Sequence, residues 1–476
     1  MAIAPQLSPA AIAVNRFGLG ARPGEPLPAD PRGWLIEQAD PRGSAYRPVP
    51  PALGGQPSSA ALAARFAERQ RALRDASDAD KPAVRKQYGE QIRDAYRDAV
   101  DARVTSALTT STPFIERLVH FWANHFAVSI EKPPVAMLAG SFENEAIRPH
   151  VLGRFEDMLI AAERHPAMQI FLDQARSVGP DSPAAARAAM KNPDNKRGLN
   201  ENLAREIMEL HTLGVRSGYT QADVTEFARA LTGWSLGAMT ANAASNPNDP
   251  TPPGAFVFRP RLHEPGTRTV MGKQYAQADE AQPLAVLHDL AASRATARHV
   301  ADKLARHFVA DAPPPALVDR LANVFADTGG DLPSMYRALV EAPEAWQSAP
   351  AKFKTPWDWT VSSLRGLGRT DLQGMRAAPL MTQLGQQVWR PGSPAGYDDV
   401  AASWAAPDAL VRRVELAQRF ASRFGQSAGD TLDARALGPQ LLAGSLSEAT
   451  ASAVARAESA PTALALLLVS PDFLRR

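Results

Sequence analysis

Apolar residues recur along most of the chain at the intervals of helices. In the strings FIERLVHFWANHF (114–126) and LAREIMELHTL (203–213), they follow one another every three or four positions. This spacing predicts helices that bury one face. Helix-forming sequence resumes near Glu280 and continues to the C-terminus. We therefore expect a mainly α fold, in which residues 1–476 form one large, elaborated, bundle-like helical domain.

Two parts of this domain differ from the rest in composition. Residues 59–110 are helix-forming and densely charged, with an interruption at Lys81-Pro82, which favours a charged helical hairpin. Residues 349–476 are expected to form a C-terminal helical part. It contains a loop rich in Pro, Gly and Trp between Trp389 and Trp404.

Residues 255–275 depart from the helical spacing. Their two halves alternate apolar and polar residues around Pro265-Gly266, which predicts one small β-hairpin inserted into the helical domain. Residues 174–199 and 236–254 are rich in Pro, Asn, Asp, Ser, Gly and Ala without a period. We expect flexible loops there.

The composition narrows the possible functions. The chain has no cysteine, which excludes disulfides, thiolate nucleophiles and zinc–cysteine sites. Its 52 basic and 50 acidic residues nearly cancel, so we expect no nucleic-acid partner. No apolar run approaches the ~18–20 residues of a membrane span. No basic segment followed by an apolar core opens the sequence, which makes the cytoplasm the default expectation. A periplasmic location, or export with a partner, is the alternative.

The first candidate site lies on the helix predicted for residues 114–126. Residues four positions apart are separated by about 40° around a helix axis, so Glu116, His120 and Asn124 share a face. His125 lies about 140° from His120 and cannot bind the same atom on a regular helix. A core hydrogen bond between Glu116 and His120 is the competing interpretation.

The second candidate site lies on the helix predicted for residues 200–213. Asn202, Glu206 and Glu209 share one face, and His211 lies on the flank. Arg205 lies four positions from Glu209, which is also the geometry of a structural ion-pair network. A buried carboxylate is costly unless it is paired or bound to a ligand. We therefore expect these carboxylates to have a partner, which is a ligand in a functional site and a basic side chain in a structural ion-pair network.

A third candidate is His263-Glu264, near the tip of the predicted β-hairpin. Residues at such a tip can close a pocket, although an exposed turn is the alternative. Five aromatic residues also gather late in the chain. These five residues either form part of the core or provide a platform for a sugar-like or polymeric ligand. They are Trp357, Trp359, Trp389, Tyr397 and Trp404. For His299 and His307 a core or surface position is the simpler interpretation.

Several long strings resemble the bacterial "domain of unknown function 1800" family. They are NRFGLGARPGE, ERLVHFWANHFAVS, NENLAREIMELHTLGVRSGYTQADVTEFARALTGW and HEPG, followed by KFKTPWDWTVSSLRGLG, LGQQVWRPGSPAGYDD and SPDFLRR. The resemblance runs essentially from end to end and implies no particular reaction. It implies a partner, because members are often encoded beside a sulfatase-like protein, and many members are exported.

These observations lead to two hypotheses. The first is a metal-dependent enzyme, a hydrolase slightly ahead of an oxidoreductase, acting on a polar small-molecule or polymeric substrate. Its divalent iron, manganese or zinc would bind between the two helices and activate water or oxygen. The predicted metal ligands are Glu116, His120, Glu206, Glu209 and His211; the catalytic residues are Glu206, His120, His263 and Glu264; the cofactor-binding residues are Asn124, Asn202 and Arg205.

Without a metal, Glu206 and His120 would form an acid–base pair. The second hypothesis is a non-catalytic helical scaffold or maturation partner of the sulfatase-like protein. In that case the polar residues are structural, and the charged helices and the aromatic loop form the docking surface.

Overall fold

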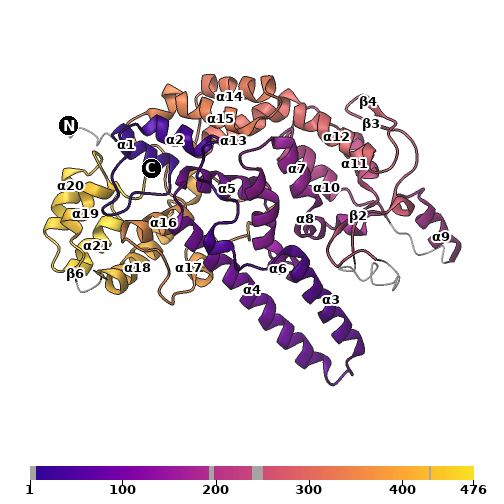
Figure 1. The fold of residues 1–476 in the computed structure, drawn as a ribbon, viewed down its shortest axis with the longest axis horizontal. Coiled ribbons are helices and arrows are strands. Elements are labelled where there is room, and N and C mark those ends of the chain that lie inside the picture. The colour runs from indigo at the N-terminus through magenta and orange to yellow at the C-terminus, as the bar shows by residue number, and fades with distance from the viewer. Residues whose placement is uncertain (1–6, 192–197, 238–249, 428–429) are drawn as a thin grey trace.

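The structure, a computed structural model, describes residues 7–191, 198–237, 250–427 and 430–476 (Figure 1). Helices account for most of the described chain, and the strands are short. The prediction of a mainly α fold is confirmed. One hydrophobic core draws on residues from Leu7 to Leu474.

The first half of the chain forms eleven of the described helices. They are α1 (Pro9–Ile12), α2 (Pro31–Ala39), α3 (Ser59–Asp75), α4 (Lys81–Thr109), α5 (Pro113–His125), α6 (Pro133–Phe142), α7 (Phe155–Arg164), α8 (Pro166–Phe171), α9 (Pro183–Lys191), α10 (Asn202–Glu206) and α11 (Gln221–Leu231). Three π-helical turns continue α1, α6 and α10. They are η1 (Ala13–Phe17), η3 (Glu143–Ile147) and η6 (Ile207–His211).

The second half adds an arc of helices and a C-terminal group (Figure 1). These helices are α12 (Ala281–Ala292), α13 (Arg294–Phe308), α14 (Pro315–Asp327), α15 (Leu332–Glu341), α16 (Pro356–Gly366), α17 (Ala377–Gln383), α18 (Pro407–Phe424), α19 (Ala434–Leu441), α20 (Glu448–Ala455) and α21 (Ala460–Leu468). Short 3-10 turns connect elements at Pro51–Leu53, Arg148–His150, Gln174–Arg176, Pro260–Leu262, Pro343–Trp346 and Ala401–Ser403. Every residue of α16 is buried.

Many helices begin at short capping sequences. The side chains of Ser8, Asp30 and Thr355 each accept a hydrogen bond from a backbone N–H three residues later, and a proline follows each of them. Proline suits the first turn because no intrahelical N–H is needed there. Thr220 and Asp223 form a reciprocal capping box at the start of α11.

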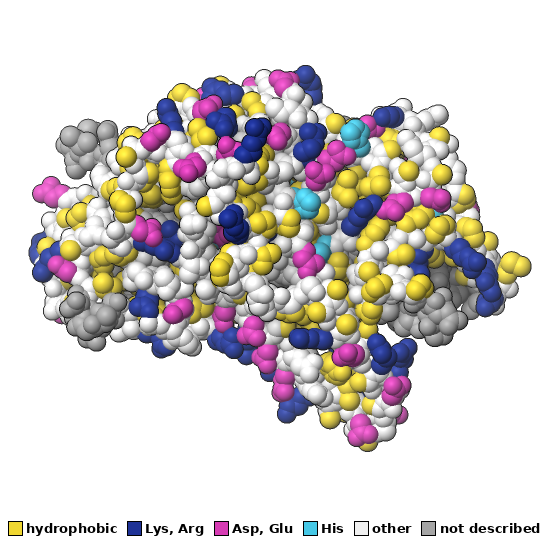
Figure 2. Space-filling view, in the orientation of Figure 1, with side chains coloured by type: hydrophobic (Ala, Val, Ile, Leu, Met, Phe, Trp, Pro, Cys, Tyr) yellow, Lys and Arg dark blue, Asp and Glu magenta, His cyan; other side chains and the backbone are white. Residues whose placement is uncertain are grey.

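Helices α3 and α4 form a hairpin that projects from the body of the protein (Figure 1). None of residues 68–95 is buried, because both helices are charged on all sides and have no apolar stripe there. Figure 2 shows charges of both signs on this projection. Burial begins at Tyr96, where α4 reaches the body and packs on α6.

The strands do not pair as the sequence predicted. In the segment 255–275, β2 (Phe256–Phe258) pairs with β1 (Trp234–Leu236), whereas β3 (Arg268–Val270) pairs with β4 (Lys273–Tyr275). A third pair joins β5 (Gln426–Ser427) to β6 (Asp430–Thr431). The hairpin around Pro265-Gly266 was therefore a wrong prediction.

The turn chemistry explains the difference. Met271 and Gly272 both have positive φ, 48° and 77°, which is the conformation of a two-residue turn that matches the twist of paired strands. Pro265 has the fixed negative φ of proline, so it cannot take the first position of such a turn.

The prediction of a flexible loop at residues 174–199 is also partly wrong. Within residues 174–199, the alanine-rich stretch Pro183–Lys191 forms helix α9, because alanine has the highest helix propensity. In the loop predicted for 236–254, residues 238–249 lie outside the described part. No helix in the described ranges has the length and apolar character needed to cross a membrane.

A buried carboxylate joins the ends of the chain to its centre. Asp358, on α16, accepts hydrogen bonds from Arg117 on α5 (2.9 Å) and from Arg476 (3.1 Å). Arg117 also donates to the carbonyl of Gly18, and Arg476 donates to the carbonyls of Arg16 and His307. Burial would raise the pKa of Asp358, but the two arginines hold it far below its usual range.

We expect the substitution Asp358→Ala to lower the free energy of unfolding by about 3–5 kcal/mol, since it leaves two buried guanidinium groups without their carboxylate. Urea unfolding followed by circular dichroism measures the loss. Asp98→Ala is the control because Asp98 pairs with Arg376 in an exposed ion pair, and its loss should be near zero. Equal effects of the two substitutions would contradict this account.

Candidate functional site

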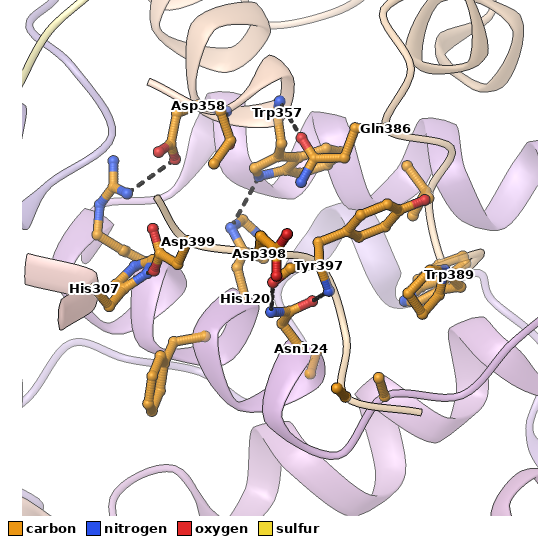
Figure 3. Close-up of a pocket in the computed structure, with 18 of the residues that line it drawn as sticks. His120, Asn124, His307, Trp357, Asp358, Gln386, Trp389, Tyr397, Asp398 and Asp399 are labelled. Atoms are coloured by element: carbon orange, nitrogen blue, oxygen red, sulfur yellow. Dashed lines mark hydrogen bonds and ion pairs between the residues drawn. The ribbon is translucent and has the colours of Figure 1, made fainter. Parts of the chain in front are cut away.

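A cavity of about 240 Å³ lies where α4, α5, α13 and α16 meet the loop of residues 386–399 (Figure 3). Its wall includes the aromatic rings of Phe121, Trp357, Trp389 and Tyr397. Charged and ionisable side chains also line it, namely Arg103, Arg117, His120, Lys303, Arg306, His307, Asp358, Asp398 and Asp399. Apolar walls with a few polar groups are typical of small-molecule sites.

At one end of the cavity, His307 of α13 is paired with Asp399 of the loop (Figure 3). An ionised carboxylate only accepts, so the imidazole donates from Nδ1. Nε2 is buried and has no hydrogen-bond partner among the described residues. Burial lowers the pKa of His307, and Asp399 opposes this shift. His307 is therefore a neutral imidazole whose free nitrogen can accept a proton.

Lys352 holds Asp399 in place. Its Nζ lies 3.4 Å from Asp399 Oδ1, and it donates to Asp311 Oδ1 (2.7 Å). Burial would raise the pKa of Asp399, but His307 and Lys352 bring it down to about 2. Asp399 is thus an anion that fixes the orientation of the imidazole.

Lys303 lies one helical turn before His307 on α13, so both side chains are on the same face. No described residue forms a hydrogen bond or an ion pair with it. Burial lowers the pKa of Lys303 to about 8, Asp399 opposes the shift, and Arg306 adds to it. The cavity therefore contains an unpaired ammonium group near the His307–Asp399 pair.

The structure places two of the predicted site residues in this cavity. His120 accepts a hydrogen bond from Trp357 Nε1 at Nδ1 (3.1 Å), and its Nε2 lies 3.5 Å from Glu116 Oε1. Burial lowers the pKa of His120 to about 4, so the ring is neutral. By accepting the hydrogen bond from Trp357 Nε1, His120 fixes the orientation of the Trp357 indole ring.

Asn124 holds the cavity loop against α5. Its amide donates to the carbonyl of Tyr397 (2.9 Å) and accepts from the Tyr397 backbone N–H (2.8 Å). A Cβ atom at Gly396, which has φ +84°, would lie 2.3 Å from the Asn124 carbonyl oxygen. Both ends of the Asn124 side chain therefore position the loop, and neither end is left for a cofactor.

Glu116 faces away from the cavity and is part of a buried ion-pair network. Arg148 contacts both of its carboxylate oxygens, at 2.8 and 2.6 Å, and Ser106 donates to Oε1. Burial would raise the pKa of Glu116, but Arg148 holds it well below its usual range. Arg148 also lies 3.5 Å from Glu143. These contacts give Glu116 a structural role in the core, whereas His120 Nε2 has no hydrogen-bond partner among the described residues.

The candidates on the second helix lie outside the cavity. The π turn η6 changes the angles between successive side chains from those of a regular helix. Buried His211 pairs with Glu163 (2.7 Å). Arg205 pairs with Glu201 (3.2 Å), while Glu206 is half-buried and its pKa is raised by burial. Asn202 and Glu209 likewise do not line the cavity.

His263 and Glu264 are buried rather than exposed at a hairpin tip. His263 Nδ1 lies 2.7 Å from the carbonyl of Thr232, and Glu264 Oε2 accepts from the backbone N–H of Asp181 (2.8 Å). They fasten their loop to the segments on either side. The strand pairing described above removes the tip on which their predicted role depended.

The predicted metal ligands are not brought together. Within the described ranges, no three His, Asp or Glu side chains are arranged to hold a metal ion. Glu116 is paired with Arg148, and His211 with Glu163. A divalent metal ion stays a prediction that this geometry does not support, and elemental analysis of the purified protein tests it.

The family of the chain follows from a comparison with family models. The model described as "Protein of unknown function (DUF1800)" matches residues 12–475. The chain belongs to the DUF1800 family. No curated protein and no solved structure matches it.

In this DUF1800 protein, sequence reasoning did not identify the pair at the end of the cavity. His307 and Asp399 are 92 positions apart, so no local spacing connects them. A weaker signal was present in the aromatic loop. Trp357, Trp389 and Tyr397 line the cavity, and Asp399 follows Tyr397 by two positions.

The His307–Asp399 pair makes a prediction about ionisation. We expect His307 to titrate below pH 6.5, because burial disfavours its cation, and to titrate lower still in Asp399→Asn, because the opposing carboxylate is removed. Imidazole signals in NMR spectra measure both values, with His307→Asn identifying the signal. A midpoint above 6.5 in the wild type, or an upward shift in Asp399→Asn, would contradict the arrangement.

Proposed function

We propose that this DUF1800 protein is an enzyme in which His307, oriented by Asp399, is the general base, and that it hydrolyses a polar substrate. The observation that carries the proposal is the pairing of His307 Nδ1 with Asp399 while Nε2 has no described partner in the wall of a cavity. A buried, unpartnered imidazole nitrogen is costly, and a catalytic role is one reason for a fold to retain it.

The arrangement supports one sequence of steps. Nε2 of His307 takes a proton from a water molecule as its oxygen attacks the substrate. The imidazolium that forms is stabilised by Asp399, which stays ionised and is held by Lys352. As the bond between the attacked atom and the leaving group breaks, the imidazolium gives its proton to the leaving group, which regenerates neutral His307. Lys303 stabilises negative charge that develops on the substrate in this partly buried space.

Hydrolysis fits these side chains because it requires a base, water and stabilisation of developing negative charge. The cavity provides the first with His307 and the last with Lys303. Phe121 and Trp357 supply apolar wall that limits access of bulk water. The substrate would be small enough to enter a space of about 240 Å³, or would be the end of a polymer.

The test is turnover of pooled polar metabolites and oligosaccharides in H₂¹⁸O, followed by mass spectrometry. We expect the wild type to produce a compound labelled with ¹⁸O, and His307→Asn to slow its formation by about 10²–10⁴-fold, the usual contribution of a general base. His288→Asn is the control, because His288 is an exposed histidine on α12. Equal turnover by His307→Asn and the wild type would contradict the proposal.

The projecting hairpin favours a second candidate function, a scaffold for the sulfatase-like protein encoded beside many family members. Residues 68–95 contribute no buried side chain, so the core of this protein does not require them. They expose charges of both signs away from the body (Figure 2). The hairpin thus offers an exposed, charged helical surface on which a partner protein can dock.

Replacing residues 69–90 with a short Gly-Ser turn tests the scaffold. We expect the variant to stay folded, since no buried residue is removed, and to lose co-purification with the sulfatase-like neighbour. Size-exclusion chromatography of the co-expressed pair measures this. The variant Lys86→Ala, in which one exposed charge is removed, serves as the control. Unchanged co-purification, or none with the wild type, would argue against this candidate.

A further inference from the structure

Arg103 enters the cavity from α4 with part of its hydrogen-bonding capacity unused. Its Nε donates to Glu143 Oε2 (2.7 Å). Its two terminal nitrogens have no hydrogen-bond or ion-pair partner among the described residues. The side chain is only 10% exposed, and it lines the cavity. A nearly buried guanidinium group whose two terminal nitrogens make no hydrogen bond within the protein can donate to an acceptor on a ligand.

The surroundings hold this guanidinium group rigidly. Its central carbon lies 4.2 Å from the ring centroid of Trp357 and 5.7 Å from that of Trp389. Trp389 Nε1 also donates to Glu143 Oε2 (3.3 Å), so the carboxylate fixes both neighbours. Stacking and the Nε bond leave the planar end of Arg103 preorganised, which is the geometry that binds two oxygens of one anion.

Lys303 gives the cavity wall a second cationic donor besides Arg103. Arg103 and Arg148 together face two carboxylates, Glu143 and Glu116, so this cluster has no excess charge, and its capacity for a ligand lies in the unused donors of Arg103. Lys303 is a second cation without a described partner. Arg117, by contrast, is neutralised by Asp358. Arg103 and Lys303 are therefore the cations of the wall that have hydrogen-bond donors to spare for a ligand.

We propose that Arg103 binds an anionic oxygen group of the ligand, a carboxylate, sulfate or phosphate, through its two terminal nitrogens. Trp389, which lies beside Arg103, and His307 are at opposite sides of the cavity in Figure 3. The anionic group thus binds away from the base. In this respect the inference rests on the proposed function, because the bond held near His307 then reacts while Arg103 anchors the other end.

Calorimetric titration of the whole protein with sodium sulfate, phosphate and acetate tests the site. Sodium chloride at equal ionic strength is the reference. We expect saturable binding of at least one of the three anions, and the anion that binds most tightly identifies the class. Arg103→Lys keeps the charge but loses the paired donors, so affinity should fall about tenfold. Arg376→Lys, at an exposed arginine, should bind like the wild type.

A second measurement covers the case in which Arg103→Lys folds poorly beside Glu143. Crystals of the wild type soaked in sodium selenate should show an anomalous selenium peak within hydrogen-bond distance of Arg103. No saturable binding of any of the three anions would overturn the proposal. So would selenate bound only elsewhere, or undiminished affinity in a folded Arg103→Lys variant.

The variant His307→Asn separates this inference from the proposed function. We expect it to bind the anion with unchanged affinity, because Arg103 belongs to the other end of the cavity. If turnover does not depend on His307 while Arg103-dependent binding persists, the catalytic proposal fails and the anion site stands. If turnover depends on His307 but anion binding is absent, only the anion site fails.

Discussion

The buried contact of Asp358 with Arg117 and Arg476 is the constraint on which the rest of the structure depends. It joins α16 and α5 at the centre of the core to the last residue of the described chain. Through the carbonyls that the arginines also bind, it reaches residues 16–18 and the end of α13. Because a desolvated carboxylate is tolerated only when it is fully paired, these segments must meet in one arrangement.

The same contact places the cavity. Asp358 lines its wall, and Arg476 binds the carbonyl of His307, so the helix end that carries the candidate base is attached to the central ion pair. The loop that supplies Asp399 is held separately by Asn124, which bonds the backbone of Tyr397. Two separate attachments thus bring together His307, on α13, and Asp399, on the loop. Such support is what a preorganised site requires.

Local periodicity was sufficient to predict the mainly α fold and the charged hairpin, because both depend on neighbours within a few residues. Pairing across the chain was not accessible in this way. The spacing of Glu116 and His120 correctly places them on one face, but Arg148, which claims the carboxylate, is 32 positions away. The turn at Met271-Gly272 depends on two positive φ values that no hydrophobic pattern reports.

The polar motifs that are densest in the sequence do not form the candidate site, and there is a general physical reason for this. A short helix rich in carboxylates and histidines attracts attention in a sequence, yet the carboxylate of Glu116 and Nδ1 of His211 are each occupied by a buried partner. A group that is already paired has little capacity left for a ligand. Among the residues that line the cavity, the groups with capacity include Nε2 of His307 and of His120, Nζ of Lys303 and the terminal nitrogens of Arg103. Missing partners that line a cavity are therefore a better guide to the candidate site than a concentration of polar residues is, and only the three-dimensional structure reveals them.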